Sequence, residues 1–208
     1  MPKNYLTILD TVENTTVIER SKFICRIKPV ADEDDAKRFV ESVKKEHSLA
    51  THNCYAYIAD ELGLVQKFSD DGEPQGTAGM PMLEVLKTRK LFKICAVVTR
   101  YFGGVKLGTG GLVRAYGGAV ADCVELSKIV SMELVKILSV KSDYDNYSKL
   151  LKMLSNENLR VTKTDFTDKV ELIVAVKTDY LQKLSEKLLD LYKGNPDVKE
   201  LSEEYFAF

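Results

Sequence analysis

The clearest structural signal in the sequence is KICAVVTRYFGGVKLGTGGLVRAYGGAV, residues 93–120. Its first eight residues form a nearly continuous apolar run, which is typical of a central strand buried on both faces. A glycine-rich loop follows, and residues 112–128 then have the pattern of a helix. Glycine inside a helix costs about 1 kcal/mol relative to alanine. Gly117 and Gly118 therefore indicate close packing of this helix on a sheet.

The residues before this stretch predict a mixed arrangement of strands and helices. Residues 15–30 alternate β-branched and polar side chains and predict strands that end near Pro29. Residues 32–47 have an apolar stripe, an acidic first turn and a basic last turn, which favour a helix. Further elements are expected as strands at 52–59 and 64–69 and a helix at 80–87.

The C-terminal part of the chain predicts a separate domain. Its expected elements, in order, are a strand at 134–142, a helix at 143–158, strands at 159–166 and 169–177, a helix at 179–194 and a strand at 197–208. This βαββαβ order is that of a ferredoxin-like domain. We place the boundary near Met132, which gives domains at 1–132 and 133–208 and an α+β fold class.

Charge is unevenly distributed along a chain whose net charge is only -1. Residues 85–121 contain seven Lys or Arg and no Asp or Glu, whereas residues 1–84 contain ten basic and fifteen acidic residues. The four cysteines form no CxxC pair, which argues against a zinc site and favours buried, reduced thiols. No segment has the pattern of a signal peptide or a membrane span, so we expect a cytoplasmic protein without a membrane partner.

The glycine-rich segment predicts an anion-binding loop. It matches neither a phosphate-binding Walker loop nor a dinucleotide fingerprint, so no cofactor is assigned. Glycines leave backbone N–H groups uncovered, and a helix N-terminus favours anions. Basic and aromatic neighbours add phosphate contacts and a stacking face. The candidate nucleic-acid or anion-binding residues are Arg100, Tyr101, Gly103, Gly104, Lys106, Gly108, Thr109, Gly110, Gly111 and Arg114.

Two other stretches contain candidate functional residues. Asp70, Asp71 and Glu73 lie in a loop that lacks EF-hand spacing, and they are either solvated turn residues or a Mg²⁺-binding or hydrogen-bond-accepting edge. His52 and Cys54 fall on one face of an expected strand, as a Cys–His nucleophilic pair or as ordinary packing residues. No catalytic residue and no metal ligand are assigned.

Three stretches resemble the hallmark segments of one known family. They are THNCYAY at 51–57, FSDDGEPQGTAGMPML at 68–83 and VVTRYFGGVKLGTGGLVRAYGGA at 97–119. Together they closely resemble the IMPACT/YigZ family, also called uncharacterised protein family 0029, over residues 5–128. The chain looks like a bacterial-type, two-domain member.

The resemblance implies both a fold and a general role. The first domain is then similar to the fourth domain of elongation factor G and to a small-subunit ribosomal protein domain, and the second to that factor's fifth domain. Eukaryotic members restrain the kinase response to amino-acid starvation with the help of an additional N-terminal domain, so that role is not transferred. The resemblance implies a translation-associated protein that binds RNA or the ribosome, and it brings no catalytic residues.

Three functions remain open on the sequence alone. The first is RNA or ribosome binding through the basic glycine-rich loop. The second is an enzyme that acts on a phosphorylated ligand or nucleotide with the acidic residues at 70–73. The third is a protein-interaction module that uses the C-terminal domain. If Lys106 and the acidic loop share one cleft, a small-ligand pocket gains support, and if they lie apart on an open face, nucleic acid does.

Overall fold

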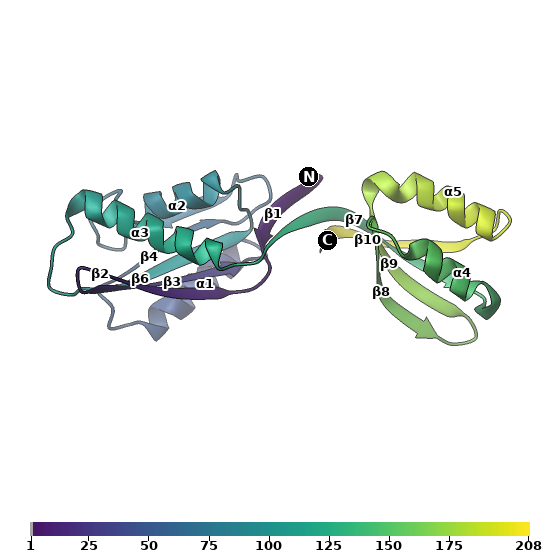
Figure 1. The fold of residues 1–208 in the computed structure, drawn as a ribbon, viewed down its shortest axis with the longest axis horizontal. Helices are drawn as coiled ribbons and strands as arrows, with labels where there is room; N and C mark the ends of the chain where they lie inside the picture. The colour runs from purple at the N-terminus through teal and green to yellow at the C-terminus, as the bar shows by residue number, and fades with distance from the viewer. Residues whose placement is uncertain (1) are drawn as a thin grey trace. The chain divides into compact units, whose positions relative to one another are not determined.

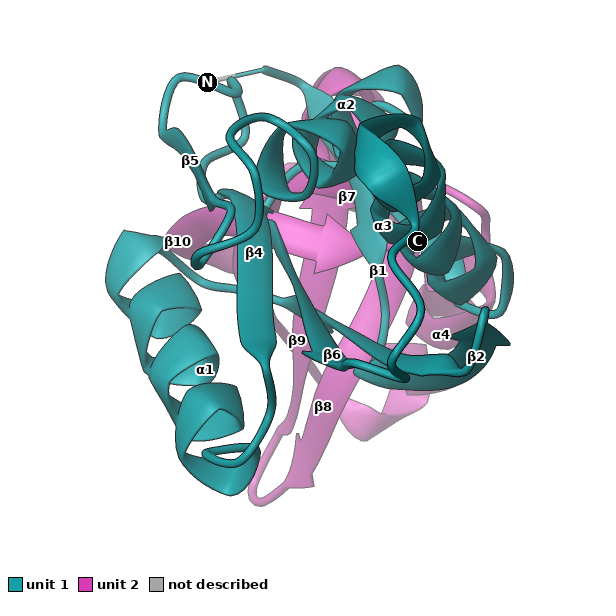
Figure 2. Cartoon of the chain, turned by 90° about the vertical axis from the view of Figure 1, so that its left-hand side faces the viewer, with its two compact units in different colours: residues 1–131 teal, residues 132–208 magenta. Residues whose placement is uncertain are grey.

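The computed structural model describes residues 2–208, and the chain divides into two compact units on either side of Ser131 (Figure 2). Unit 1 ends with Ser131, and unit 2 comprises Met132–Phe208. Each unit has a β-sheet and a hydrophobic core of its own (Figure 1). Among residues 2–208, no helix combines the length and apolar character that a membrane crossing requires.

Unit 1 contains an antiparallel five-stranded sheet with the order β2-β3-β6-β4-β5. Its central strand, β6, is buried on both faces as expected, because α1 covers one face and α2 and α3 cover the other (Figure 2). The strands of unit 1 are β1 (Asn4–Ile8), β2 (Val12–Ile18), β3 (Ser21–Pro29), β4 (His52–Ile58), β5 (Gln66–Ser69) and β6 (Ile94–Tyr101). Its helices are α1 (Glu33–Glu46), α2 (Gly79–Thr88) and α3 (Gly108–Glu125).

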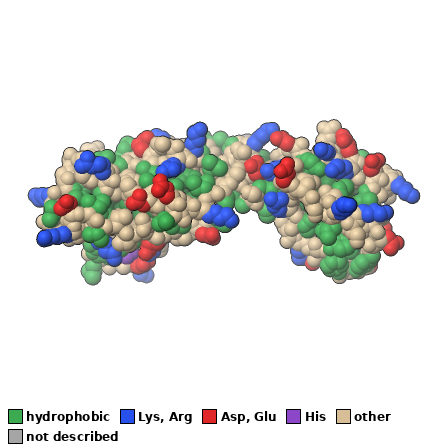
Figure 3. Space-filling view, viewed as in Figure 1, with side chains coloured by type: hydrophobic (Ala, Val, Ile, Leu, Met, Phe, Trp, Pro, Cys, Tyr) green, Lys and Arg blue, Asp and Glu red, His purple; other side chains and the backbone are tan. Residues whose placement is uncertain are grey.

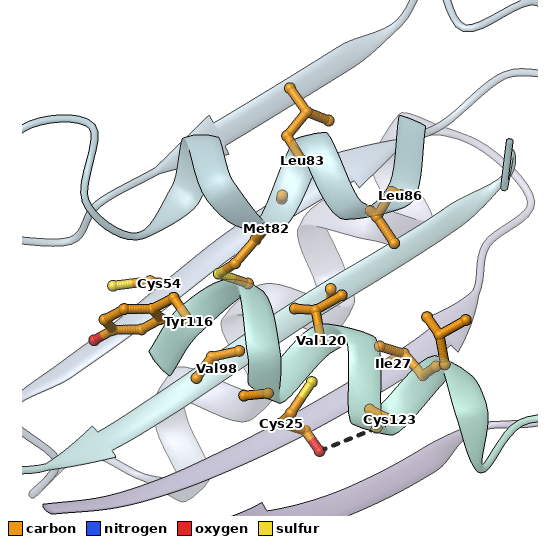
Figure 4. Packing of buried hydrophobic residues seen from close by; sticks show 14 of the residues in the cluster. Cys25, Ile27, Cys54, Met82, Leu83, Leu86, Val98, Tyr116, Val120 and Cys123 are labelled. Carbon is orange, nitrogen blue, oxygen red and sulfur yellow. Dashed lines mark hydrogen bonds between the residues drawn. The ribbon is translucent and has the colours of Figure 1, made fainter. Parts of the chain in front are cut away.

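Helix α3 packs on the sheet through residues spaced three and four apart. Tyr116, Val120 and Cys123 point from α3 toward the strands (Figure 4). The Cys123 thiol donates to the carbonyl oxygen of Cys25 on β3, at 3.6 Å. This face fixes the position of the first turn of the helix relative to the end of β6.

Helix α3 begins earlier than the sequence predicts. The expected start was residue 112, but the helix starts at Gly108, so the glycines at 108–111 form its first turn. Gly108 has φ of +68°, a conformation that side chains disfavour, and Leu107 at the N-cap makes no side-chain hydrogen bond to the helix. The glycine-rich segment is therefore divided between a short loop and a helix start.

Gly103 is required by close packing on a turn. Glu19 and Arg20 form the tight β2–β3 turn with φ of 45° and 64°. A Cβ atom on Gly103 would lie 2.0 Å from the carbonyl carbon of Arg20. The close packing expected of Gly117 and Gly118 is wrong at Gly118, where a Cβ atom would meet nothing within 4 Å.

Unit 2 has the expected ferredoxin-like topology. Its sheet order is β10-β7-β9-β8 with antiparallel pairs throughout, and α4 and α5 pack on one face. Leu150 and Leu184 are fully buried on the core side of these two helices. The elements are β7 (Ile129–Ser142), α4 (Tyr144–Leu154), β8 (Leu159–Phe166), β9 (Val170–Lys177), the 3₁₀ turn η1 (Thr178–Tyr180), α5 (Leu181–Leu191) and β10 (Asp197–Ala207).

The different surroundings of two glycines predict opposite effects of alanine. Gly103→Ala forces a methyl group into the backbone of Arg20, so we expect the free energy of unfolding to fall by about 2–3 kcal/mol. Gly118→Ala adds a methyl group in open space on a helix and is expected to raise it by about 0.5–1 kcal/mol. Urea denaturation of both variants measures the difference, and equal stabilities would contradict the packing described here.

Candidate anion-binding site

A pocket of about 420 Å³ lies in unit 1 where four segments meet. These segments are the start of β4, the β5–α2 loop, the end of β6 and the first turn of α3. The volume lies within the range of about 300–1,000 Å³ that is usual for small-ligand sites. The pocket is lined by Thr51, His52, Glu73, Pro74, Arg100, Phe102, Lys106, Leu107, Gly108, Thr109 and Leu112.

A buried ion pair forms the floor of this pocket. The Arg100 guanidinium donates through Nη1 to Glu73 Oε1 at 2.7 Å, and the two side chains are only 6% and 3% exposed. The Tyr116 hydroxyl donates to the same carboxylate oxygen, also at 2.7 Å. Burial raises the pKa of the Tyr116 hydroxyl, so that it stays protonated and remains a donor.

Arg100 therefore occupies a different position from the one expected of a surface phosphate ligand. The sequence predicts an exposed cation, but the guanidinium lies inside, 5.4 Å from the ring centres of both Phe23 and Phe102. Its Nη2 donates to Ser21 Oγ at 3.3 Å. Its Nε is buried and has no hydrogen-bond partner within residues 2–208. This unused donor belongs to a residue that lines the pocket.

His52 faces the same pocket because it is the cross-strand partner of Arg100. Its Nδ1 lies 2.8 Å from the carbonyl oxygen of Asp71. Its Nε2 lies 3.8 Å from Glu73 Oε2. The contact with the Asp71 carbonyl fixes the orientation of the imidazole ring, so that Nε2 faces the Glu73 carboxylate.

The two aspartates of the acidic loop have structural contacts. Asp70 Oδ1 accepts hydrogen bonds from the N–H groups of Ala78 and Gly79, two donors at the start of α2 that have no partner within the helix. Asp71 accepts from the N–H of Asn53 at 2.7 Å and pairs with Lys44 at 3.0 Å. Of the three acidic residues proposed from the sequence, only Glu73 lines the pocket. The described residues contain no group of three or more His, Cys, Asp or Glu side chains that could hold a metal ion.

Two further candidates lie outside the pocket. Tyr101 follows Arg100 on β6 and points to the opposite side of the sheet, where its hydroxyl lies 3.0 Å from His47 Nδ1. It therefore offers no stacking face beside Arg100.

The Cys54 thiol is fully buried and donates to the Asp70 carbonyl, and burial raises its pKa to about 12. A thiol with this pKa is a poor nucleophile at neutral pH, which argues against a Cys–His pair.

Hydrogen-bond donors and positive charge surround the mouth of the pocket. Lys106, Gly108 and Thr109 line it at the start of α3. The first turn of α3 contains no acidic side chain, and its N–H groups carry the positive end of the helix dipole. Arg114 is exposed further along α3. Neither Lys106 nor Arg114 has an ion-pair partner within the described part of the chain, and Figure 3 shows basic side chains at this end of unit 1.

The other glycines of the segment have different roles. Gly104 has φ of +86° and lies in open space, so it serves the conformation of the loop. Gly110 also lies in open space, in the first turn of α3. A Cβ atom on Gly111 would lie 3.0 Å from the Cβ of Leu107, which indicates a tight helix start.

Sequence reasoning missed two residues that shape the site. Phe102 is 47% exposed at the rim, and side-chain alternation from Arg100 places it on the pocket side of the chain. Tyr116 lies one helical turn beyond Leu112, on the buried face of α3, and this spacing signals its inward direction. Its bond to Glu73 joins two segments that are 43 residues apart, and no sequence pattern reveals such a contact.

The fold and the pocket define a class of two-domain α+β proteins whose first unit is one antiparallel sheet with helices on both faces and whose second unit is ferredoxin-like. The chain matches the model of the Impact N-terminal domain over residues 19–124 and that of a domain of unknown function (DUF1949) over residues 140–195. The chain belongs to the IMPACT family, as the sequence resemblance indicates.

Relatives of this chain include proteins of similar length. It is 42% identical to the IMPACT family member YvyE of Bacillus subtilis, over 96% of this chain and 92% of that protein. It is 36% identical to the IMPACT family member YigZ of Escherichia coli, over 89% of this chain and 92% of that protein. A crystal structure of a hypothetical protein, 33% identical, aligns with a TM-score of 0.63 and covers 98% of this chain and 100% of that one.

The buried ion pair predicts a large effect when one partner is removed. Glu73→Gln leaves Arg100 charged and without a counterion, so we expect the free energy of unfolding to fall by about 3–5 kcal/mol. In Glu73→Gln/Arg100→Met both charges are absent, and we expect much of the loss to be recovered. Denaturant unfolding of the wild type, both single variants and the double variant gives the coupling. Additive losses would contradict a direct charge pair.

Proposed function

We propose that this chain is a translation-associated protein that binds RNA, free or within the ribosome, by receiving a backbone phosphate at the mouth of the pocket. One observation carries the proposal: the uncapped start of α3 opens into a pocket that is also lined by Lys106 and by the buried Arg100. Backbone N–H groups and cations converging on one cavity favour a phosphate group.

Several contacts support an anion as the ligand. The charge of Arg100 is balanced by Glu73, so the excess positive charge comes from Lys106 and the α3 helix dipole. Phe102 exposes an aromatic face at the rim, on which a base of single-stranded RNA can stack.

RNA binding of this kind depends on identifiable cations. For Lys106→Ala and Arg114→Ala, we expect weaker binding to short single-stranded RNA of any sequence, with the salt slope of log K reduced by about 0.7–1 for each lost phosphate contact. Lys149→Ala, an exposed lysine on α4, is the matched control and is expected to bind as the wild type. Fluorescence anisotropy at several salt concentrations measures both quantities.

The proposal has a clear contrary outcome. Absence of RNA binding by the wild-type protein at low salt, together with no co-sedimentation with ribosomes, would overturn it. Wild-type affinity in both Lys106→Ala and Arg114→Ala would instead place the RNA-binding surface elsewhere on the chain.

A second candidate function has an observation in its favour. Glu73 of the acidic loop and Lys106 of the glycine-rich segment line one pocket, which suits a small phosphorylated ligand or a nucleotide. Under this alternative, a panel of nucleotides and sugar phosphates raises the melting temperature with one clear preference, and Lys106→Ala abolishes the shift. A flat panel at millimolar ligand, with RNA binding intact, would leave RNA as the ligand.

A further inference from the structure

The tautomer of His52 follows from its backbone contact. The Asp71 carbonyl oxygen can only accept, so Nδ1 of His52, 2.8 Å away, carries the proton that forms this bond. In the neutral imidazole the other nitrogen, Nε2, is then an acceptor. The His52 side chain lines the pocket and makes no other hydrogen bond among residues 2–208, so this acceptor is available to a ligand.

Glu73 offers a second acceptor beside the first. Its Oε1 takes both internal donors, from Arg100 and from Tyr116, whereas Oε2 receives no hydrogen bond from any described residue. His52 Nε2 lies 3.8 Å from Oε2, beyond the hydrogen-bond range of about 2.7–3.2 Å. Although the Glu73 side chain as a whole is only 3% exposed, Oε2 is open to the pocket and can accept a hydrogen bond there. A hydroxyl or amino group of a ligand can therefore donate a hydrogen bond to the pocket floor.

The rest of the pocket presents hydrogen-bond donors and therefore favours a ligand group that accepts hydrogen bonds. Lys106 and the N–H groups at the start of α3 are donors and favour a phosphate. A ligand that satisfies both halves of a 420 Å³ pocket carries an anionic group and a hydroxyl donor within a few bonds of each other. In a ribonucleotide the 2′-hydroxyl lies on the carbon next to the one that carries the 3′-phosphate oxygen, and this pair of groups fits the requirement.

We infer that the pocket recognises RNA by its sugar: the 2′-hydroxyl of the nucleotide whose phosphate lies at the start of α3 donates its single proton in a bond shared by His52 Nε2 and Glu73 Oε2, which lie 3.8 Å apart. The inference rests on the proposed function, because it assumes that an RNA phosphate occupies the mouth of the pocket. It adds selectivity that phosphate contacts do not provide, since phosphates are common to RNA and DNA and the 2′-hydroxyl is not.

Three oligonucleotides of one sequence test this inference on the intact wild-type protein. They are an eight-nucleotide RNA, its 2′-O-methyl analogue and the corresponding DNA, each compared by fluorescence anisotropy at low and moderate salt. Only the RNA has a 2′ proton to donate. A hydrogen bond to a charged acceptor corresponds to about tenfold or more in affinity, so we expect the RNA to bind that much more tightly than either analogue.

Variants of the two histidines identify the group responsible. In His52→Ala we expect RNA affinity to fall to that of the 2′-O-methyl analogue, with binding of the two analogues unchanged. His47→Ala is the matched control, because His47 contacts Tyr101 on the opposite side of the sheet, and it is expected to keep the wild-type preference. Full discrimination by His52→Ala would overturn the role of His52.

The outcomes separate this inference from the proposed function. Equal wild-type affinity for all three oligonucleotides, with all three weakened by Lys106→Ala, would overturn recognition of the 2′-hydroxyl and leave phosphate binding supported. Absence of binding to every oligonucleotide at low salt would overturn both. The wild-type comparison needs no variant, so a folding defect in His52→Ala does not affect it.

Discussion

The charge pair between Glu73 and Arg100 is the constraint on which the organisation of unit 1 depends. Both side chains are almost completely removed from water, and a buried charge is tolerated when an opposite charge lies directly beside it. The Tyr116 hydroxyl on α3 donates a second hydrogen bond to the same carboxylate oxygen, so one acidic side chain joins the β5–α2 loop, the central strand and the long helix. The pocket exists because these three segments are held at one point.

This arrangement also explains why a segment rich in glycine and basic residues behaves so unevenly. Gly103 permits the chain to pass against the Arg20 backbone, while Gly104 and Gly108 adopt positive φ that directs the chain into α3. The cations divide in the same way. Arg100 is paired with Glu73 inside, whereas Lys106 and Arg114 are exposed. Proximity in sequence therefore does not imply a shared role.

Local patterns predicted the elements, and distant contacts determined the site. Apolar runs and alternation are properties of neighbouring residues, so β6 and the βαββαβ order of unit 2 were predictable from the sequence. The opposite directions of Arg100 and Tyr101 follow from strand alternation, but which direction is inward depends on how helices cover the sheet. The hydrogen bonds of Asp70 to the start of α2 and of Tyr116 to Glu73 arise only on folding. Composition could therefore propose these groups and could not assign their partners.

The contact of Gly103 with the β2–β3 turn has a consequence for how the site can be altered. This turn contains no pocket residue, yet its backbone supports the chain directly after Phe102, the aromatic residue at the rim. The β2–β3 hairpin therefore limits how closely the backbone at Gly103 can approach, and so helps to position Phe102. Exchanging the hairpin for a longer or shorter one would therefore change access to the cavity while leaving every residue that lines it in the sequence.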